Sequence, residues 1–241
     1  IQTWVPHEED MSGAVPLFNI PAAVEGVRHG MQFRQAEARA AQLLTSMTAR
    51  NTDSAADQWL EAYLSGSAAE RRGFLNALQF ASPLQLRQLG QSAQSHVAER
   101  AELVAVAGRA ALALHDRATL EQILQSGHGP ALANILRDST ERLQPLDQAL
   151  LLLHAIENAP AENASLAIAL LAPGLQNNTA VTDSLFDLLE DSALGASAAL
   201  ALSRYSNAGV QQRLRKLAGG DSPESKRVRL AIDMAATGTL E

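Results

Sequence analysis

AIAL at residues 167–170 returns as ALAL at 199–202 and as AIDM at 231–234, each time after 32 residues. A fixed period of about 20 to 50 residues is typical of repeat proteins, in which each unit buries its apolar face only against its neighbours. Between these tetrapeptides, Leu-x-x-Leu pairs at 185/188 and 214/217 predict a second helix in each unit. The C-terminal third of the chain therefore predicts a solenoid of paired helices.

The composition favours helices throughout. Apolar residues make up 46% of the chain and aromatic residues only 4%, so alanine and leucine carry the predicted core. Cores with few rings and few β-branched residues suit close helix packing better than a sheet. No stretch alternates strongly between apolar and polar residues, so we predict an all-α fold.

The N-terminal segment, residues 1–30, differs from the rest because prolines and glycines interrupt it. Proline lacks a backbone donor and disfavours a helical conformation in the residue before it, so this segment predicts an extended arm. The arm is also apolar, and we expect it to cover the surface of the helices. Its prolines are Pro6, Pro16 and Pro21, and its large apolar residues include Trp4, Leu17 and Phe18.

Two further segments follow the arm. Residues 31–159 predict irregular helical hairpins and residues 160–241 predict the repeats, together forming one continuous solenoid. Capping boxes at Ser54, Ser67 and Ser82, and prolines at 130, 145 and 160, predict where helices begin. We also expect a single helix over 93–115, and a helix over 146–157 that is buried on all sides because it is apolar on all sides.

The sequence of the repeats resembles that of a known repeat family. It rests on residues 198–202, Asn207, Val210, Leu214, Leu217, Asp221 and 228–231. This pattern resembles HEAT-like repeats of the short, phycobilisome-lyase type, over about residues 160–236. The resemblance implies a right-handed α-α superhelix whose second helices line a concave surface that binds a protein or peptide.

Charge is distributed unevenly in the second half of the chain. Residues 143–203 contain seven acidic residues and no lysine or arginine, whereas residues 204–229 contain seven basic and two acidic residues. Arg213, Arg215 and Lys216 lie on a predicted second helix and are the candidate partner-binding residues, for an acidic partner or another copy of the chain. The alternative is that both charge sets are solvated outer faces. The net charge of −7 argues against nucleic acid as the partner.

Catalytic and metal-binding patterns are sparse. The order of His96, His115 and Asp116, followed by Asp138 or Asp147, is similar to that of the all-α HD phosphohydrolases, whose His and Asp residues bind metal. The alternative is that His115 ends one helix and Asp116 caps the next. Residues 7–10 (HEED) are candidate ligands of a divalent ion, or a solvated acidic loop.

We therefore expect a non-enzymatic scaffold or adaptor with no catalytic residues, no metal site and no cofactor, and we keep a metal-dependent hydrolase as the alternative. The start at Ile1 fits either a removed signal peptide or a domain boundary, and the chain has no cysteine. We expect a bacterial periplasmic or secreted location, with the cytoplasm as the alternative. No apolar stretch approaches the roughly 20 residues that a membrane span needs.

Overall fold

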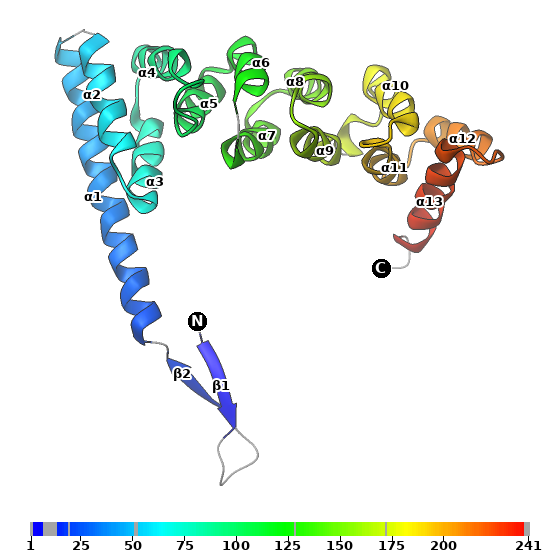
Figure 1. The fold of residues 1–241 in the computed structure, drawn as a ribbon, viewed down its shortest axis with the longest axis horizontal. Coiled ribbons are helices and arrows are strands. Elements are labelled where there is room, and N and C mark those ends of the chain that lie inside the picture. Colours follow the sequence, from blue (N-terminus) through cyan, green and yellow to red (C-terminus); the bar gives the residue numbers. More distant parts are fainter. Residues whose placement is uncertain are drawn as a thin grey trace. The chain divides into compact units, whose positions relative to one another are not determined.

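The structure is a computed structural model that describes residues 2–6, 14–18, 20–50, 53–127, 129–171 and 173–238. These residues form thirteen α-helices, three short 3-10 helices and one two-stranded hairpin (Figure 1). The all-α class is therefore confirmed for the body of the chain. The chain divides into two compact units, Ile1–Ser92 and Ala93–Glu241, rather than at the predicted boundaries after residues 30 and 159.

The first unit begins with the hairpin. Strands β1 (Gln2–Pro6) and β2 (Ala14–Phe18) pair antiparallel, with Thr3 opposite Leu17. The prediction of an arm over residues 1–30 is wrong at its C-terminal end, because α1 (Ile20–Arg50) already begins at Ile20. The second residue of this helix is Pro21, and a proline in the first turn costs no hydrogen bond. The arm's predicted contacts fall on side chains outside the described residues.

Three more helices complete the first unit: α2 (Asp53–Leu64), α3 (Ala68–Ala77) and α4 (Pro83–Ser95), with the 3-10 helix η1 (Leu78–Phe80) between the last two. Its core holds the ring of Trp59 edge-on to Phe74, with 5.0 Å between ring centroids. The buried Gln85 Nε2 donates to the Leu44 carbonyl over 2.6 Å and so fastens α4 to α1.

The second unit consists of helices that pack as two rows (Figure 1). The first row is α5 (Leu103–Leu114), α7 (Pro130–Arg142), α9 (Ala161–Leu170), α11 (Gly195–Ser203) and α13 (Pro223–Gly238). The second row is α6 (Arg117–Ser126), α8 (Pro145–Asn158), α10 (Thr179–Asp187) and α12 (Ala208–Leu217). The 3-10 helices η2 (Pro173–Leu175) and η3 (Leu188–Glu190) flank α10. Successive helices of the first row contact one another, as expected of stacked helical pairs.

The repeated tetrapeptides lie on equivalent helices of the first row. Ala167, Ala199 and Ala231 are buried on α9, α11 and α13, where a small side chain allows the helices to approach closely. Side-chain contacts between successive pairs join residues 30 apart, namely Asn177 with Asn207 and Asp183 with Arg213. The spacing across the second row is therefore slightly shorter than the 32 residues between the tetrapeptides.

Several helix starts are confirmed by their capping contacts. Ser67 and Glu70 form a capping box at α3, and Ser82 and Gln85 exchange the same pair of hydrogen bonds at α4. Pro130 and Pro145 occupy the first turns of α7 and α8, and Pro160 is the N-cap of α9. The box predicted at Ser54 is wrong, since α2 begins one residue earlier and Asp57 accepts a hydrogen bond from Ser92 Oγ over 2.7 Å.

Two predicted helices differ from the structure. The expected helix over 93–115 is split between α4, which ends at Ser95, and α5, which begins at Leu103, and the exposed residues 98–102 lie between them. The helix over 146–157 is present as part of α8, but Leu146 is 65% exposed and Leu150 39% exposed. The helix is apolar all round, yet it is not buried on all sides, because α8 lies in the second row and one of its faces is exposed.

Candidate partner-binding site

Helix α12 carries the three predicted partner-binding residues. Its N-cap is Asn207, whose side chain accepts a hydrogen bond from the Gly209 amide over 2.8 Å. The helix buries Val210 and Leu214, whereas Gln212, Arg213, Arg215 and Lys216 are exposed. Arg213, Arg215 and Lys216 lie at the surface of the helix, and all three are exposed. The structure therefore places the three predicted side chains at the surface of one helix.

Arg213 is already engaged within the chain. Its Nη1 lies 2.5 Å from Asp183 Oδ1 on α10, and its guanidinium lies 4.0 Å from the centroid of the Phe186 ring. The pair is exposed, with 45% of the Arg213 side chain and 62% of the Asp183 side chain open to solvent. Part of the charge asymmetry seen in the sequence is therefore satisfied between neighbouring helical pairs.

A cavity of about 280 Å³ lies beside this ion pair, between α10 and α12. Its lining includes Gln176, Thr182, Phe186, Asn207, Val210 and Arg213. The loops at its rim are held by hydrogen bonds: Gln176 Oε1 accepts from the Ser206 amide over 2.9 Å, and Asn207 Nδ2 donates to Asn177 Oδ1 over 3.0 Å. The cavity thus has a fixed polar rim, an aromatic wall and one cation.

Two of these contributors were missed by sequence reasoning. Gln176 and Phe186 belong to the repeat before α12, and no motif marks either of them. The signal that could have found them is the spacing itself, because a repeat of about 30 residues brings residue 183 beside 213 and residue 176 beside 206. The spacing alone does not show that these residues meet. The structure shows it, because successive helical pairs contact one another there.

The other basic residues of 204–229 divide into two groups. Arg227 Nη1 donates to the Leu189 carbonyl over 2.5 Å, and Arg229 Nη1 donates to the Gly220 carbonyl over 2.7 Å. Arg227 therefore supports the 3-10 helix η3, and Arg229 supports the turn that follows α12. The remaining four lie at least partly open to solvent, and in the part of the chain that the structure describes no ion pair involves them: Arg204, Arg215, Lys216 and Lys226.

The residues of the alternative, metal-dependent hydrolase have structural roles. His115 is the left-handed C-cap of α5, with φ 54°, and Asp116 is the N-cap of α6, where it accepts from the Thr119 amide and hydroxyl. Asp138 lies 3.9 Å from Arg109. Within the described ranges, no three His, Asp or Glu side chains come close enough to hold a metal ion, so His96 does not join His115 and Asp116 in such a group. Residues 7–10 lie outside the described residues.

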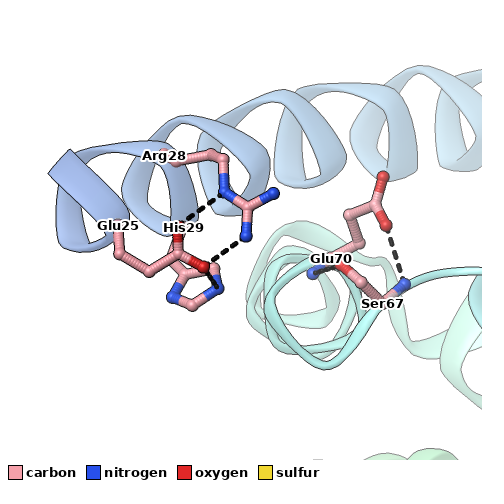
Figure 2. A network of polar contacts seen from close by, with 5 residues as sticks. All are labelled: Glu25, Arg28, His29, Ser67 and Glu70. Atoms are coloured by element: carbon pink, nitrogen blue, oxygen red, sulfur yellow. Dashed lines mark hydrogen bonds and ion pairs between the residues drawn. The ribbon is translucent and has the colours of Figure 1, made fainter. Parts of the chain in front are cut away.

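A second polar cluster lies in the first unit (Figure 2). Glu25 on α1 pairs with Arg28, and His29 Nε2 lies 3.7 Å from the same carboxylate. The hydrogen bond from Arg28 lowers the pKa of Glu25, with the charges of Arg28 and His29 acting in the same direction. These residues lie within one turn and a half of a single helix and are exposed. We assign them to support of the helix surface and not to a binding site.

Comparison with known proteins finds no matching family model, no matching curated protein and no matching solved structure. Among the described helices, none is both long enough and apolar enough to cross a membrane.

Proposed function

We propose that this chain is a non-enzymatic scaffold or adaptor that binds an acidic protein or peptide at α12 and the adjoining cavity. The observation that carries the proposal is the position of Arg213, which lies over Phe186 at the edge of a polar cavity and forms its ion pair with an exposed carboxylate. Exposed ion pairs contribute about 0–1 kcal/mol, so a partner's carboxylate can replace Asp183 at little cost.

Arg215 and Lys216 extend this cationic surface. Both lie on the same helix as Arg213 and reach solvent, and in the described residues neither takes part in an ion pair. Clustered cations speed the approach of an acidic partner and fix its orientation more than they add to affinity. Self-association through the acidic residues of 143–203 of another copy is one form that this partner can take.

The proposal also covers how the helices of the second unit are arranged. We infer that the helical pairs of the second unit form a right-handed, HEAT-like superhelix with the second row on its concave side. The contacts of each helix with its neighbours along the two rows, and the 30-residue pairing between repeats, support this inference. We further propose a periplasmic or secreted location, with which the absence of cysteine is compatible. Fractionation of the native cell tests that location.

The binding proposal is tested by exchanging charge on α12. A photo-crosslinking amino acid placed at Gln212, an exposed position on the same helix, captures whatever binds this surface. We expect a discrete crosslinked partner whose yield falls in the Arg215→Glu/Lys216→Glu variant. Raised salt lowers the yield from the unmodified chain, because the attraction is between exposed charges.

The matched control is Arg204→Glu/Lys226→Glu, which changes the net charge equally at exposed positions outside α12. Retained crosslinking in this control, together with loss in the α12 variant, places the partner on α12. If both variants crosslink as strongly as the unmodified chain, α12 is not the binding surface. Equal loss in both variants would mean that overall charge, and not this surface, attracts the partner.

A further inference from the structure

Helix α13 is the last described helix of the first row, and one of its faces is open to solvent (Figure 1). Its main contacts are with α11, α12 and η3, and it buries Val228 and Ala231 completely. Another face carries Leu230, which is 55% exposed, and Met234, which is 40% exposed. Residues three or four apart share one face of a helix. We call this surface the end face, and it consists of Lys226, Leu230, Asp233 and Met234, all exposed.

The preceding repeat shows how the same positions are used when a neighbour is present. Ala198 and Leu202 lie on α11, 32 residues before the two apolar residues of the end face, and both are fully buried. They share a side of α11 with Gly195, because the three residues follow helical spacing. A Cβ added at Gly195 would lie 2.6 Å from Arg227 Nη1 on α13. The next helix of the row therefore covers these positions on α11.

The end face is thus a stacking surface. In stacked repeats, the outer face of a terminal unit has to be polar to remain soluble. The end face instead presents a leucine and a methionine, and burying such side chains is favourable. What covers them must also accommodate two charges, because Lys226 lies one turn before Leu230 and Asp233 lies one turn after it.

The order of these charges is self-complementary. In an antiparallel pair of identical helices related by a twofold axis beside Leu230, Lys226 of each copy lies next to Asp233 of the other. Parallel pairing would set each charge against its like, which is unfavourable. A twofold contact requires one surface that complements itself, whereas a contact with an unrelated helix does not. The charges therefore favour a second copy of the chain over another partner.

We propose that a second copy of this chain covers the end face, with the two α13 helices antiparallel and Leu230 against Leu230. The aliphatic stem of Lys226 lies along Met234 of the second copy, and its ammonium group reaches Asp233 of that copy. A carboxylate has about four acceptor positions, so a polar contact of Asp233 within its own chain does not prevent this pairing. The proposal does not rest on the function proposed for α12.

Sedimentation velocity of the full chain at several concentrations tests for this dimer. One pair of helices buries less than the roughly 1,000 Å² of a stable interface, so we expect a dissociation constant on the order of 10–100 μM. A chain that stays monomeric up to about 1 mM would overturn the proposal. Species that keep growing beyond a dimer would overturn it as well, because a twofold contact is closed.

Leu230→Asp tests the surface. We expect this variant to dimerise at least about tenfold more weakly, because it places a charge at the centre of the contact. The matched control is Leu146→Asp, at a leucine of α8 that is 65% exposed, and it should dimerise like the unmodified chain. Circular dichroism should show the same helicity in both variants, since both positions are exposed. An unchanged dimer in Leu230→Asp, or equal loss in both variants, would overturn the assignment.

Charge reversal tests the antiparallel arrangement. Lys226→Glu places two carboxylates side by side across the contact, and we expect about fivefold weaker dimerisation. The double variant Lys226→Glu/Asp233→Lys should restore the dimer, because it exchanges the charges without changing their pairing. An acid near the start of α13 and a base near its end both favour the helix, so these changes do not unfold it. A double variant no better than Lys226→Glu would overturn the antiparallel pairing. The charges of α12 are the same in all these variants, so the crosslinking experiment on that helix has a separate outcome.

Discussion

Gly73 shows how a single missing side chain sets the packing of the first unit. A Cβ at this position would collide with the Phe33 carbonyl oxygen and would lie 2.9 Å from the Glu37 amide nitrogen, both on α1. These are backbone atoms, so they cannot move aside as a flexible side chain would. The close crossing of α1 and α3 therefore depends on glycine. At Gly26, on the same long helix, no described atom lies within 4 Å of the place that a Cβ would take.

We expect opposite effects from the same added methyl group at these two sites. Gly73→Ala should lower the free energy of unfolding by about 1–3 kcal/mol, because it forces two helix backbones apart. Gly26→Ala should raise it by up to about 1 kcal/mol, because alanine favours an exposed helix where nothing obstructs it. Urea denaturation of both variants measures the difference. A tolerated Gly73→Ala would show that α1 and α3 do not cross this closely.

At the scale of the element, α3 begins with a capping box that is also a pH-dependent contact (Figure 2). The Glu70 carboxylate accepts from the Ser67 amide over 2.7 Å, and the Ser67 hydroxyl accepts from the Glu70 amide over 3.4 Å. The backbone hydrogen bond from Ser67, followed by its side-chain hydrogen bond, lowers the pKa of Glu70 below 4.5. The folded state therefore favours the ionised carboxylate.

We expect the stabilisation from this lowered pKa to be present above pH 4.5 and to be lost as the pH falls through the lower folded pKa. The Glu70→Gln variant cannot titrate, so its stability should decrease less between about pH 5 and pH 3 than that of the unmodified chain. Ser67→Ala should cost about 1 kcal/mol at neutral pH, because it removes the N-cap acceptor. Parallel acid slopes for Glu70→Gln and the unmodified chain would contradict this assignment.

Helix starts were more predictable than the extent and surroundings of helices. The boxes at Ser67 and Ser82, and the prolines at 130 and 145, act through contacts within one turn, which a sequence displays directly. The break after Ser95 and the exposed face of α8 depend on what lies beside each helix. A local pattern does not contain that information, so the prediction of one helix over 93–115 was wrong, and the helix over 146–157 is present but not buried on all sides.

At the scale of the whole molecule, the division into two compact units predicts separate cores. Trp59 lies buried in the first unit, beside Tyr63 and Phe74, and the chain's only other tryptophan is Trp4. Leu132 is fully buried in the second unit, on α7. Trp59 fluorescence in a Trp4→Phe background therefore reports on the first unit, while circular dichroism reports helices of both.

We expect Leu132→Ala to lower the main circular-dichroism midpoint, because a buried leucine truncated to alanine costs about 2–5 kcal/mol. The fluorescence midpoint of Trp59 should stay unchanged in this variant. Leu60→Ala, at a buried position of the first unit, is the matched control and should lower the fluorescence midpoint instead. Midpoints that move together in both variants would show that the chain unfolds as one cooperative body.

The candidate site illustrates the same limit of sequence reasoning. The charge pattern pointed to Arg213, Arg215 and Lys216, and all three lie at the surface of α12. The pattern did not show that Arg213 pairs with Asp183, nor that Phe186 lies beneath it, since those contacts join separate repeats. It also could not reveal that the buried Nδ2 of Asn163, on α9, has no hydrogen-bond partner among the described residues.

The sequence by itself determined the helical class, the repeat of the last third and most of the helix starts, because apolar periodicity, caps and prolines act over a few residues. Only the tertiary structure decided the division after Ser92, the crossing at Gly73 and the cavity between α10 and α12. Those features arise where surfaces distant in the chain meet, and their free energy depends on shape and on which polar groups find partners. A one-dimensional pattern specifies which residues are apolar or charged, but not which neighbours they meet.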